Sequence, residues 1–95
     1  MKFLASDPVQ RWLVALPPDT KKRVRAALRG LQTGRGDIKA LSGELEGFCR
    51  LRIDGLRIVF SQHRGHIIRL EHADSRDVVY ETFLKVLRER KMQDL

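Results

Sequence analysis

The chain has few of the residues that mark a secreted or a membrane-bound protein. Only one of its 95 residues is a cysteine, Cys49, so no disulfide can form within the chain. No apolar run reaches the roughly 18 residues that a membrane-spanning helix needs. The N-terminus also lacks the apolar stretch of a signal peptide. We therefore expect a cytoplasmic protein, with its thiol in a reducing compartment and with no membrane partner.

Histidines and acidic residues are scarce as well. Three histidines and one cysteine do not have the spacing of a zinc site, and we expect neither a metal nor a small-molecule cofactor. The 12 acidic residues are outnumbered by 19 lysines and arginines, which gives a net charge of +7. This excess is typical of a protein that binds nucleic acid or an acidic partner.

The residues that are present predict a single domain, 1–95, of the α+β class. Lys2 to Ala5 is a candidate edge strand, and Asp7-Pro8 is typical of a helix start. Apolar residues at helical spacing then predict two helices, with stripes Val9, Trp12, Leu13 and Leu16, and Val24, Ala27, Leu28 and Leu31. The Pro17-Pro18 pair separates the two helices. Because the connection is short, we expect an antiparallel helical hairpin.

The second half of the chain predicts three strands, at 48–53, 56–62 and 67–73, which pair consecutively as a meander. Helical spacing resumes at the end with Val79, Phe83, Val86 and Leu87. The predicted order is βααβββα: an N-terminal helical hairpin packed on a small, mostly antiparallel β-sheet, with a C-terminal helix. The helical hairpin is expected to cover one face of the sheet and to leave the other partly open.

The first two of these strands carry the most informative pattern. Asp54-Gly55 between two β-prone runs predicts a two-residue hairpin turn. With that turn, Arg52 faces Arg57, and Arg50 shares their side of the sheet. Like charges directly opposite each other are unfavourable on a sheet. The arrangement indicates that these guanidinium groups bind an anion, and a nucleic-acid phosphate is the natural choice.

Further basic and aromatic residues suit the same ligand. Arg76 and Tyr80 are four residues apart, so on one helical turn they would project from the same side. Guanidinium groups with an aromatic ring are typical of RNA sites, where the ring stacks on a base. Lys21, Lys22 and Arg25 belong to a basic helix face, which is either solvated or a contact for RNA phosphates.

Read in order, these motifs resemble the RelE/ParE toxin superfamily. The resemblance rests on Leu41-Ser42-Gly43, Arg50-Leu51-Arg52, Leu56-Arg57-Ile58-Val59-Phe60 and Arg76-Asp77-Val78-Val79-Tyr80, and it covers nearly the whole chain. It implies a toxin of a bacterial toxin–antitoxin system, with a RelE-like fold and a cognate antitoxin as partner. RelE-like members cut messenger RNA in the ribosomal A site, whereas ParE-like members poison DNA gyrase.

The resemblance also implies a role for each matching residue. Arg50 and Arg52 would bind RNA and activate the attacking ribose 2′-hydroxyl. Arg57 would stabilise the scissile phosphate, and Arg76 would assist the leaving 5′-oxygen. Tyr80 would stack on the nucleotide. We thus expect Arg52, Arg57, Arg76 and Tyr80 to be catalytic, Arg50, Lys21, Lys22 and Arg25 to bind RNA, and no residue to bind a metal.

Three functions follow from this resemblance. The first is a metal-independent endoribonuclease that cleaves messenger RNA on the ribosome and so inhibits translation. The second is a ParE-like gyrase inhibitor without nuclease activity, and the third a chain that only binds its antitoxin. Many RelE-like members have lysine where this chain has Arg50 or Arg52. Arginine is a poor proton acceptor, which leaves the general base open between His72 and no residue at all.

Overall fold

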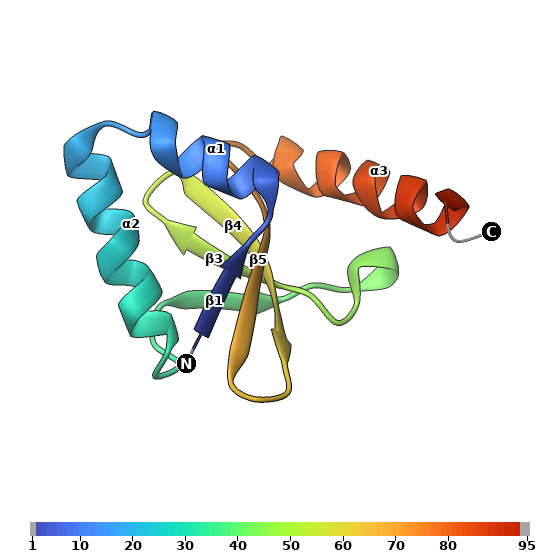
Figure 1. Cartoon of the computed structure of the whole chain (residues 1–95), viewed down its shortest axis with the longest axis horizontal. Coiled ribbons are helices and arrows are strands. Elements are labelled where there is room, and N and C mark those ends of the chain that lie inside the picture. Colours follow the sequence, from blue (N-terminus) through green and yellow to red (C-terminus); the bar gives the residue numbers. More distant parts are fainter. Residues whose placement is uncertain (1, 94–95) are drawn as a thin grey trace.

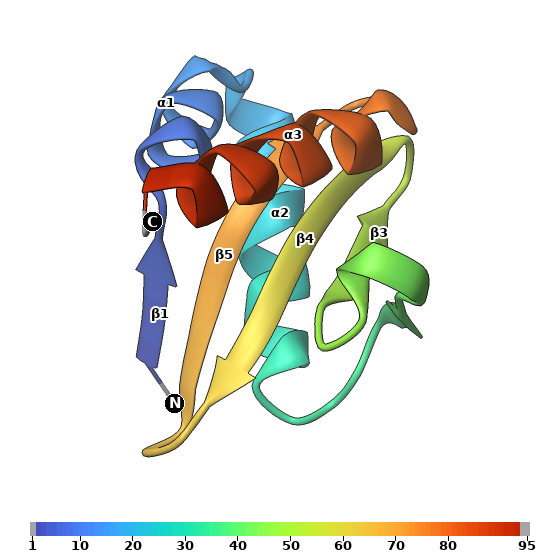
Figure 2. The same cartoon turned by 90° about the vertical axis from the view of Figure 1, so that its right-hand side faces the viewer.

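The structure, a computed structural model, describes residues 2–93 and has an α+β fold (Figure 1). A five-stranded sheet lies between helices on its two faces, as the side view in Figure 2 shows. The strands are β1 (Lys2–Ala5), β2 (Asp37–Ala40), β3 (Cys49–Ile53), β4 (Leu56–His63) and β5 (Ile67–Asp74). The helices are α1 (Asp7–Ala15), α2 (Pro18–Leu31) and α3 (Val78–Gln93), with a short 3-10 helix η1 (Gly43–Leu45).

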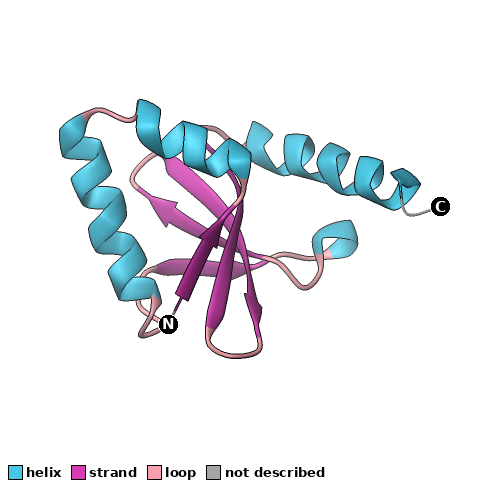
Figure 3. Cartoon of the chain, in the orientation of Figure 1, coloured by secondary structure: helices cyan, strands magenta, loops and turns pink. Residues whose placement is uncertain are grey.

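The sheet, whose strands are magenta in Figure 3, is mixed and has the strand order β1-β5-β4-β3-β2. Strands β2 to β5 pair in antiparallel fashion, whereas β1 lies parallel to β5 at one edge. The predicted class is therefore confirmed, but the predicted order βααβββα is not. The predicted edge strand at the start of the chain is confirmed as β1, and the order differs because β2 is an additional strand between α2 and β3. All four residues of β2 are exposed, and the polar–apolar alternation of Asp37-Ile38-Lys39-Ala40 spans only four positions, so the sequence analysis did not single this strand out.

The predicted antiparallel helical hairpin is wrong. Figure 1 shows α1 running across the top of the molecule while α2 descends along one side. Leu16 and Pro17, which join the helices, both have extended backbone, with ψ of 143° and 153°. Each precedes a proline, whose ring disfavours the helical conformation in the residue before it. The two helices therefore diverge, and α1 packs against β5 while α2 packs against β3.

Alternation along the central strands produces two separate apolar clusters. Ile58 and Phe60 of β4 point toward α1 and α2, where Val9, Val24 and Leu31 are fully buried. Val59, between them on the same strand, points to the opposite face. There it packs with Val79 and Phe83 of α3 and with the partly buried residues Leu41, Leu45, Phe48, Tyr80 and Leu87. Helix α3 thus covers part of the arginine-bearing face of the sheet.

The predicted β3–β4 hairpin is confirmed pair by pair. Arg52 lies opposite Arg57, and Arg50 opposite Val59. Asp54 in the turn has a positive φ of 53°, a conformation that aspartate tolerates better than most residues. The hairpin register therefore places the three arginines where the sequence predicted them.

Candidate functional site: an arginine pocket between the sheet and helix α3

A pocket of about 250 Å³ lies where β2, β3 and β4 meet the start of α3. We call it the arginine pocket; its walls are formed by Lys39, Leu41, Arg50, Arg52, Arg57, Asp77 and Tyr80. Sheet geometry explains the convergence. Arg50 and Arg52 are two residues apart on β3, Arg57 is opposite Arg52, and Lys39 of β2 is opposite Arg50. Four cationic side chains from three neighbouring strands therefore share one concave surface.

Arg57 is the most firmly held of these side chains and is only 14% exposed. Its Nε lies 2.7 Å from Oδ1 of Asp77, and its Nη1 donates to the carbonyl oxygens of Gly55 at 2.9 Å and Ser75 at 3.4 Å. The acceptors come from the β3–β4 turn and from the connection between β5 and α3. Nη2 has no hydrogen-bond partner within the described part of the chain. Arg57 is thus oriented by the protein and keeps one donor group for a ligand.

The other two strand arginines also have oxygen partners. Nη1 of Arg50 is 3.5 Å from Oδ1 of Asp37, and the Arg50 side chain is 12% exposed. Arg52 is exposed, and its Nε donates to the carbonyl oxygen of Asp54 at 3.3 Å. These contacts offset part of the repulsion that the sequence predicted for guanidinium groups on adjacent strands.

Tyr80 and Arg76, which the sequence placed together, lie in different environments. Tyr80 is in the first turn of α3, partly buried, and lines the arginine pocket. Arg76 precedes the helix, because α3 begins only at Val78. Its side chain is 77% exposed, with Nε 3.9 Å from Oδ1 of Asp74, and it does not line the pocket. The expectation that the two residues share one face of a helical turn is wrong.

Sequence reasoning missed two residues of the pocket. Lys39 was overlooked because β2, a strand of only four exposed residues, was not predicted. Asp77 lies within one of the motifs but was given no role, whereas its carboxylate binds Arg57. The signal that would have found Asp77 is its position directly before α3, at the end of the sheet where Arg57 also lies opposite Asp74.

His72, the candidate base, does not line the arginine pocket. It lies opposite Val59 beneath α3, and its ring stacks on Phe83 with 6.2 Å between centroids and an interplanar angle of 25°. Burial lowers the pKa of His72 from its usual value, and the nearby charge of Asp74 only partly opposes this shift. The position of the ring is that of a packing residue.

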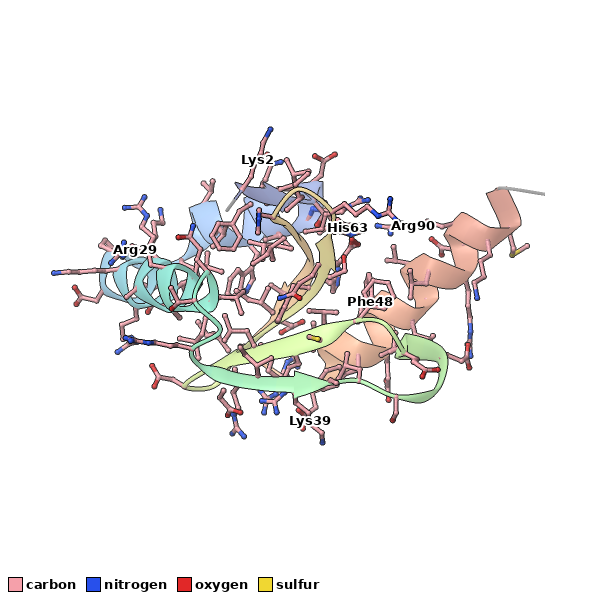
Figure 4. The ribbon with its side chains drawn as sticks, turned by 90° about the horizontal axis from the view of Figure 1, so that it is seen from below. Lys2, Arg29, Lys39, Phe48, His63 and Arg90 are labelled. Carbon is pink, nitrogen blue, oxygen red and sulfur yellow. The ribbon has the colours of Figure 1, made fainter. Side chains whose placement is uncertain are left out.

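The basic residues of α2 are also separate from the pocket. Lys21 and Arg25 border a second groove of about 180 Å³ between α1 and α2, together with Leu13, Val14 and Leu28. Lys22 is exposed on the same helix. Helix α2 covers the sheet face opposite to α3, and in Figure 4 Arg29 of α2 lies far from Lys39. The structure therefore does not bring Lys21, Lys22 and Arg25 to the arginine pocket.

Two arginine–glutamate pairs tether α3, which carries Tyr80. Arg88 binds Glu44 of η1, with Nη2 to Oε1 at 2.8 Å and Nε to Oε2 at 3.3 Å. Hydrogen bonding to Arg88 lowers the pKa of Glu44. Nη1 of Arg90 lies 3.4 Å from the buried carboxylate of Glu71, which also binds Arg69 at 3.1 Å. Figure 4 shows Arg90 on α3 and Phe48 beneath the same helix.

No helix within residues 2–93 has both the length and the apolar character needed to span a membrane. The same residues contain no group of three or more histidine, cysteine or acidic side chains placed to bind a metal ion.

The fold has counterparts among solved structures, although no protein family model and no curated protein sequence matches the chain. A chain of the RelBE2 toxin–antitoxin complex of Mycobacterium tuberculosis is 23% identical, with a TM-score of 0.65 over 79% of this chain and 96% of that one. A chain of the YoeB–YefM complex of Staphylococcus aureus is 16% identical, with a TM-score of 0.64 over 78% and 94%. A chain of the RelB–RelE antitoxin–toxin complex of Methanococcus jannaschii is 21% identical, with a TM-score of 0.65 over 84% and 98%. The resemblance inferred from the sequence is thus confirmed in the fold, which is that of chains in RelE- and YoeB-type toxin–antitoxin complexes.

Proposed function

We propose that this chain is the toxin of a toxin–antitoxin pair and that it acts as an endoribonuclease on messenger RNA. The observation that carries the proposal is the convergence of Arg50, Arg52, Arg57 and Tyr80 on one pocket. The fold shared with toxin–antitoxin complexes supports it. In this proposal the protein is cytoplasmic, acts on messenger RNA in the ribosomal A site, and is held inactive by a cognate antitoxin.

The proposed reaction is attack of a ribose 2′-hydroxyl on the adjacent phosphorus, with departure of the 5′-oxygen. This reaction needs an in-line geometry and stabilisation of the negative charge that builds up on the phosphate oxygens, and it needs no metal ion. Nη2 of Arg57 is available for a phosphate oxygen, and Arg50 and Arg52 add positive charge on the same surface. Charge-assisted bonds of this kind are about twice as strong as neutral ones.

The remaining residues position the RNA and the leaving group. Tyr80 stacks on a base next to the cut and so fixes the direction in which the strand crosses the pocket. Arg76, exposed before α3, approaches the leaving 5′-oxygen from the rim. Lys21, Lys22 and Arg25 contact ribosomal RNA phosphates with the opposite side of the molecule, which would add affinity without sequence preference.

The test replaces Arg57 with alanine and maps transcript ends by primer extension in cells that express the chain. Loss of one preorganised donor to a developing oxyanion lowers the rate by roughly 10²–10³-fold, so cuts within codons should disappear for Arg57→Ala. Arg11→Ala is the matched control, because Arg11 is an exposed arginine on α1 outside the pocket. Retained cutting by Arg57→Ala, or DNA breakage without transcript cuts for the unchanged chain, would contradict the proposal. The second result would favour the gyrase inhibitor.

A further inference from the structure

The arginine pocket contains one carboxylate, that of Asp77, among four cationic side chains. Arginine offers donors only and stays charged, and the lysine ammonium has no acceptor either. While they are charged, the cations of the pocket can hold a phosphate but cannot take up the proton that the 2′-hydroxyl must lose. Asp77 supplies the acceptor oxygens that the other charged groups lack.

We propose that Asp77 is the proton acceptor of the cleavage reaction, an inference that rests on the proposed function. Its side chain is 80% exposed, and its Oδ1 is 2.7 Å from Nε of Arg57. The carboxylate thus lies beside a guanidinium whose Nη2 has no hydrogen-bond partner among residues 2–93. In RNA the 2′-hydroxyl is attached next to the phosphate that it attacks. A single arginine therefore places the scissile phosphate and the base next to each other.

The second oxygen of Asp77, Oδ2, makes no hydrogen bond with residues 2–93. Although Asp77 directly precedes α3, its side chain does not cap the helix; its backbone carbonyl accepts from the Tyr80 amide at 3.2 Å instead. Other aspartates near the pocket, Asp37 and Asp74, do not line it. The carboxylate is oriented by one contact and otherwise open to the ligand.

The proton balance of the step is simple. The 2′-oxygen forms a bond to phosphorus while its proton moves to Oδ2 of Asp77. The bond between phosphorus and the 5′-oxygen breaks, and the 5′-oxygen takes a proton from solvent water. The products are a 2′,3′-cyclic phosphate and a 5′-hydroxyl end. Asp77 then returns its proton to solvent.

The test compares Asp77→Asn with the unchanged chain in single-turnover cleavage of a defined messenger on purified ribosomes, from pH 3.5 to 8. Asparagine keeps an acceptor for Nε of Arg57 and removes only the basic carboxylate. A general base contributes about 10²–10⁴-fold to a rate, so we expect a loss of that size. We also expect the fall in rate at acid pH that a carboxylate base produces to vanish in the variant. Asp37→Asn is the matched control, since Asp37 also pairs with a pocket arginine but lies outside the pocket.

Binding is measured separately, on ribosomes carrying a messenger with a 2′-deoxynucleotide at the cut, which cannot react. Charged or titratable groups facing Asp77 are Lys39, Arg50, Arg52, Arg57 and Tyr80 in the pocket and Asp74 and Arg76 along the chain. All are unchanged in Asp77→Asn, so equal binding with slow cleavage supports the inference. If Asp77→Asn cleaves within threefold of the rate of the unchanged chain, the inference is overturned. It is also overturned if the variant is slow but its rate still falls at acid pH, or if its binding weakens by as much as its cleavage rate. If the unchanged chain does not cleave RNA, the proposed function fails together with this inference; an active Asp77→Asn overturns the inference alone.

Discussion

The contact between Phe48 and Phe83 offers the sharpest test of how α3 is held over the sheet. Phe83 is fully buried, and its ring meets that of Phe48 edge to face, with 5.0 Å between centroids and 83° between planes. Phe48 lies just before β3, and Phe83 lies in the middle of α3, one turn beyond Tyr80. The pair therefore joins the strand that carries Arg50 to the helix that carries Tyr80.

The expected coupling energy between Phe48 and Phe83 follows from the edge-to-face geometry of their rings. An edge-to-face aromatic pair contributes about 0.5–1.5 kcal/mol beyond the area that it buries. We expect Phe48→Leu and Phe83→Leu each to lower the free energy of unfolding, and the double variant to lose less than their sum by this coupling energy. For a domain of this size, each 1 kcal/mol corresponds to a fall in melting temperature of roughly 4–8 °C. Phe83→Ala would cost about 3–5 kcal/mol, a large part of the stability of a small domain.

The assay is urea unfolding of the four chains of this double-mutant cycle, followed by circular dichroism. Val14→Ala serves as the control, because Val14 is 77% exposed and should change stability by less than about 0.5 kcal/mol. A coupling energy of zero between Phe48 and Phe83 would refute the reasoning, since it would mean that α3 does not rest on Phe48 in solution.

Three further predictions concern the turn, the strand β2 and the pH dependence. Asp54→Val should destabilise the chain by about 1–2 kcal/mol because Asp54 has a positive φ, whereas Asp54→Asn should not; urea midpoints distinguish the two. Gly36→Ala should cost about 1–3 kcal/mol, since φ is +125° and the added Cβ would lie 2.9 Å from Leu51 Cδ1; equal urea midpoints would contradict this. Burial lowers the pKa of His72 in the folded chain, so the unfolded chain binds a proton first as the pH falls. Stability should therefore drop as the pH falls below about 6.5, and urea midpoints at pH 5 to 7 should show a smaller drop for His72→Phe.

The parts of the fold that the sequence predicted are those with strong local signals. The Asp54-Gly55 turn sets the register of β3 and β4, and with it the pairing of Arg52 with Arg57. The apolar stripe containing Val79 and Phe83 likewise predicted that α3 would bury one side. In each case, residues close in the sequence determine the result.

What the sequence could not predict depends on contacts between distant segments. Strand β2 exists because it pairs with β3, and its own alternation spans only four exposed residues, which is too short a signal to identify it. The direction of α2 follows from the backbone of Leu16 and Pro17, which a count of linker residues does not reveal. Lys39 and Asp77 reach the arginine pocket through these longer-range arrangements, and so both were missed.

The arrangement of charges in the pocket also changes how its arginines are understood. The sequence suggested unpaired guanidinium groups awaiting an anion, but Arg50 and Arg57 each have a carboxylate partner, Asp37 and Asp77. Both arginines are nearly buried, while both carboxylates are largely exposed. An exposed carboxylate can turn toward solvent at little cost, whereas a buried guanidinium that lost every partner would be strongly destabilised. The pocket can therefore keep its arginines in place without a ligand, and Arg50 can exchange its contact with Asp37 for a phosphate when RNA enters while Asp77 stays beside Arg57.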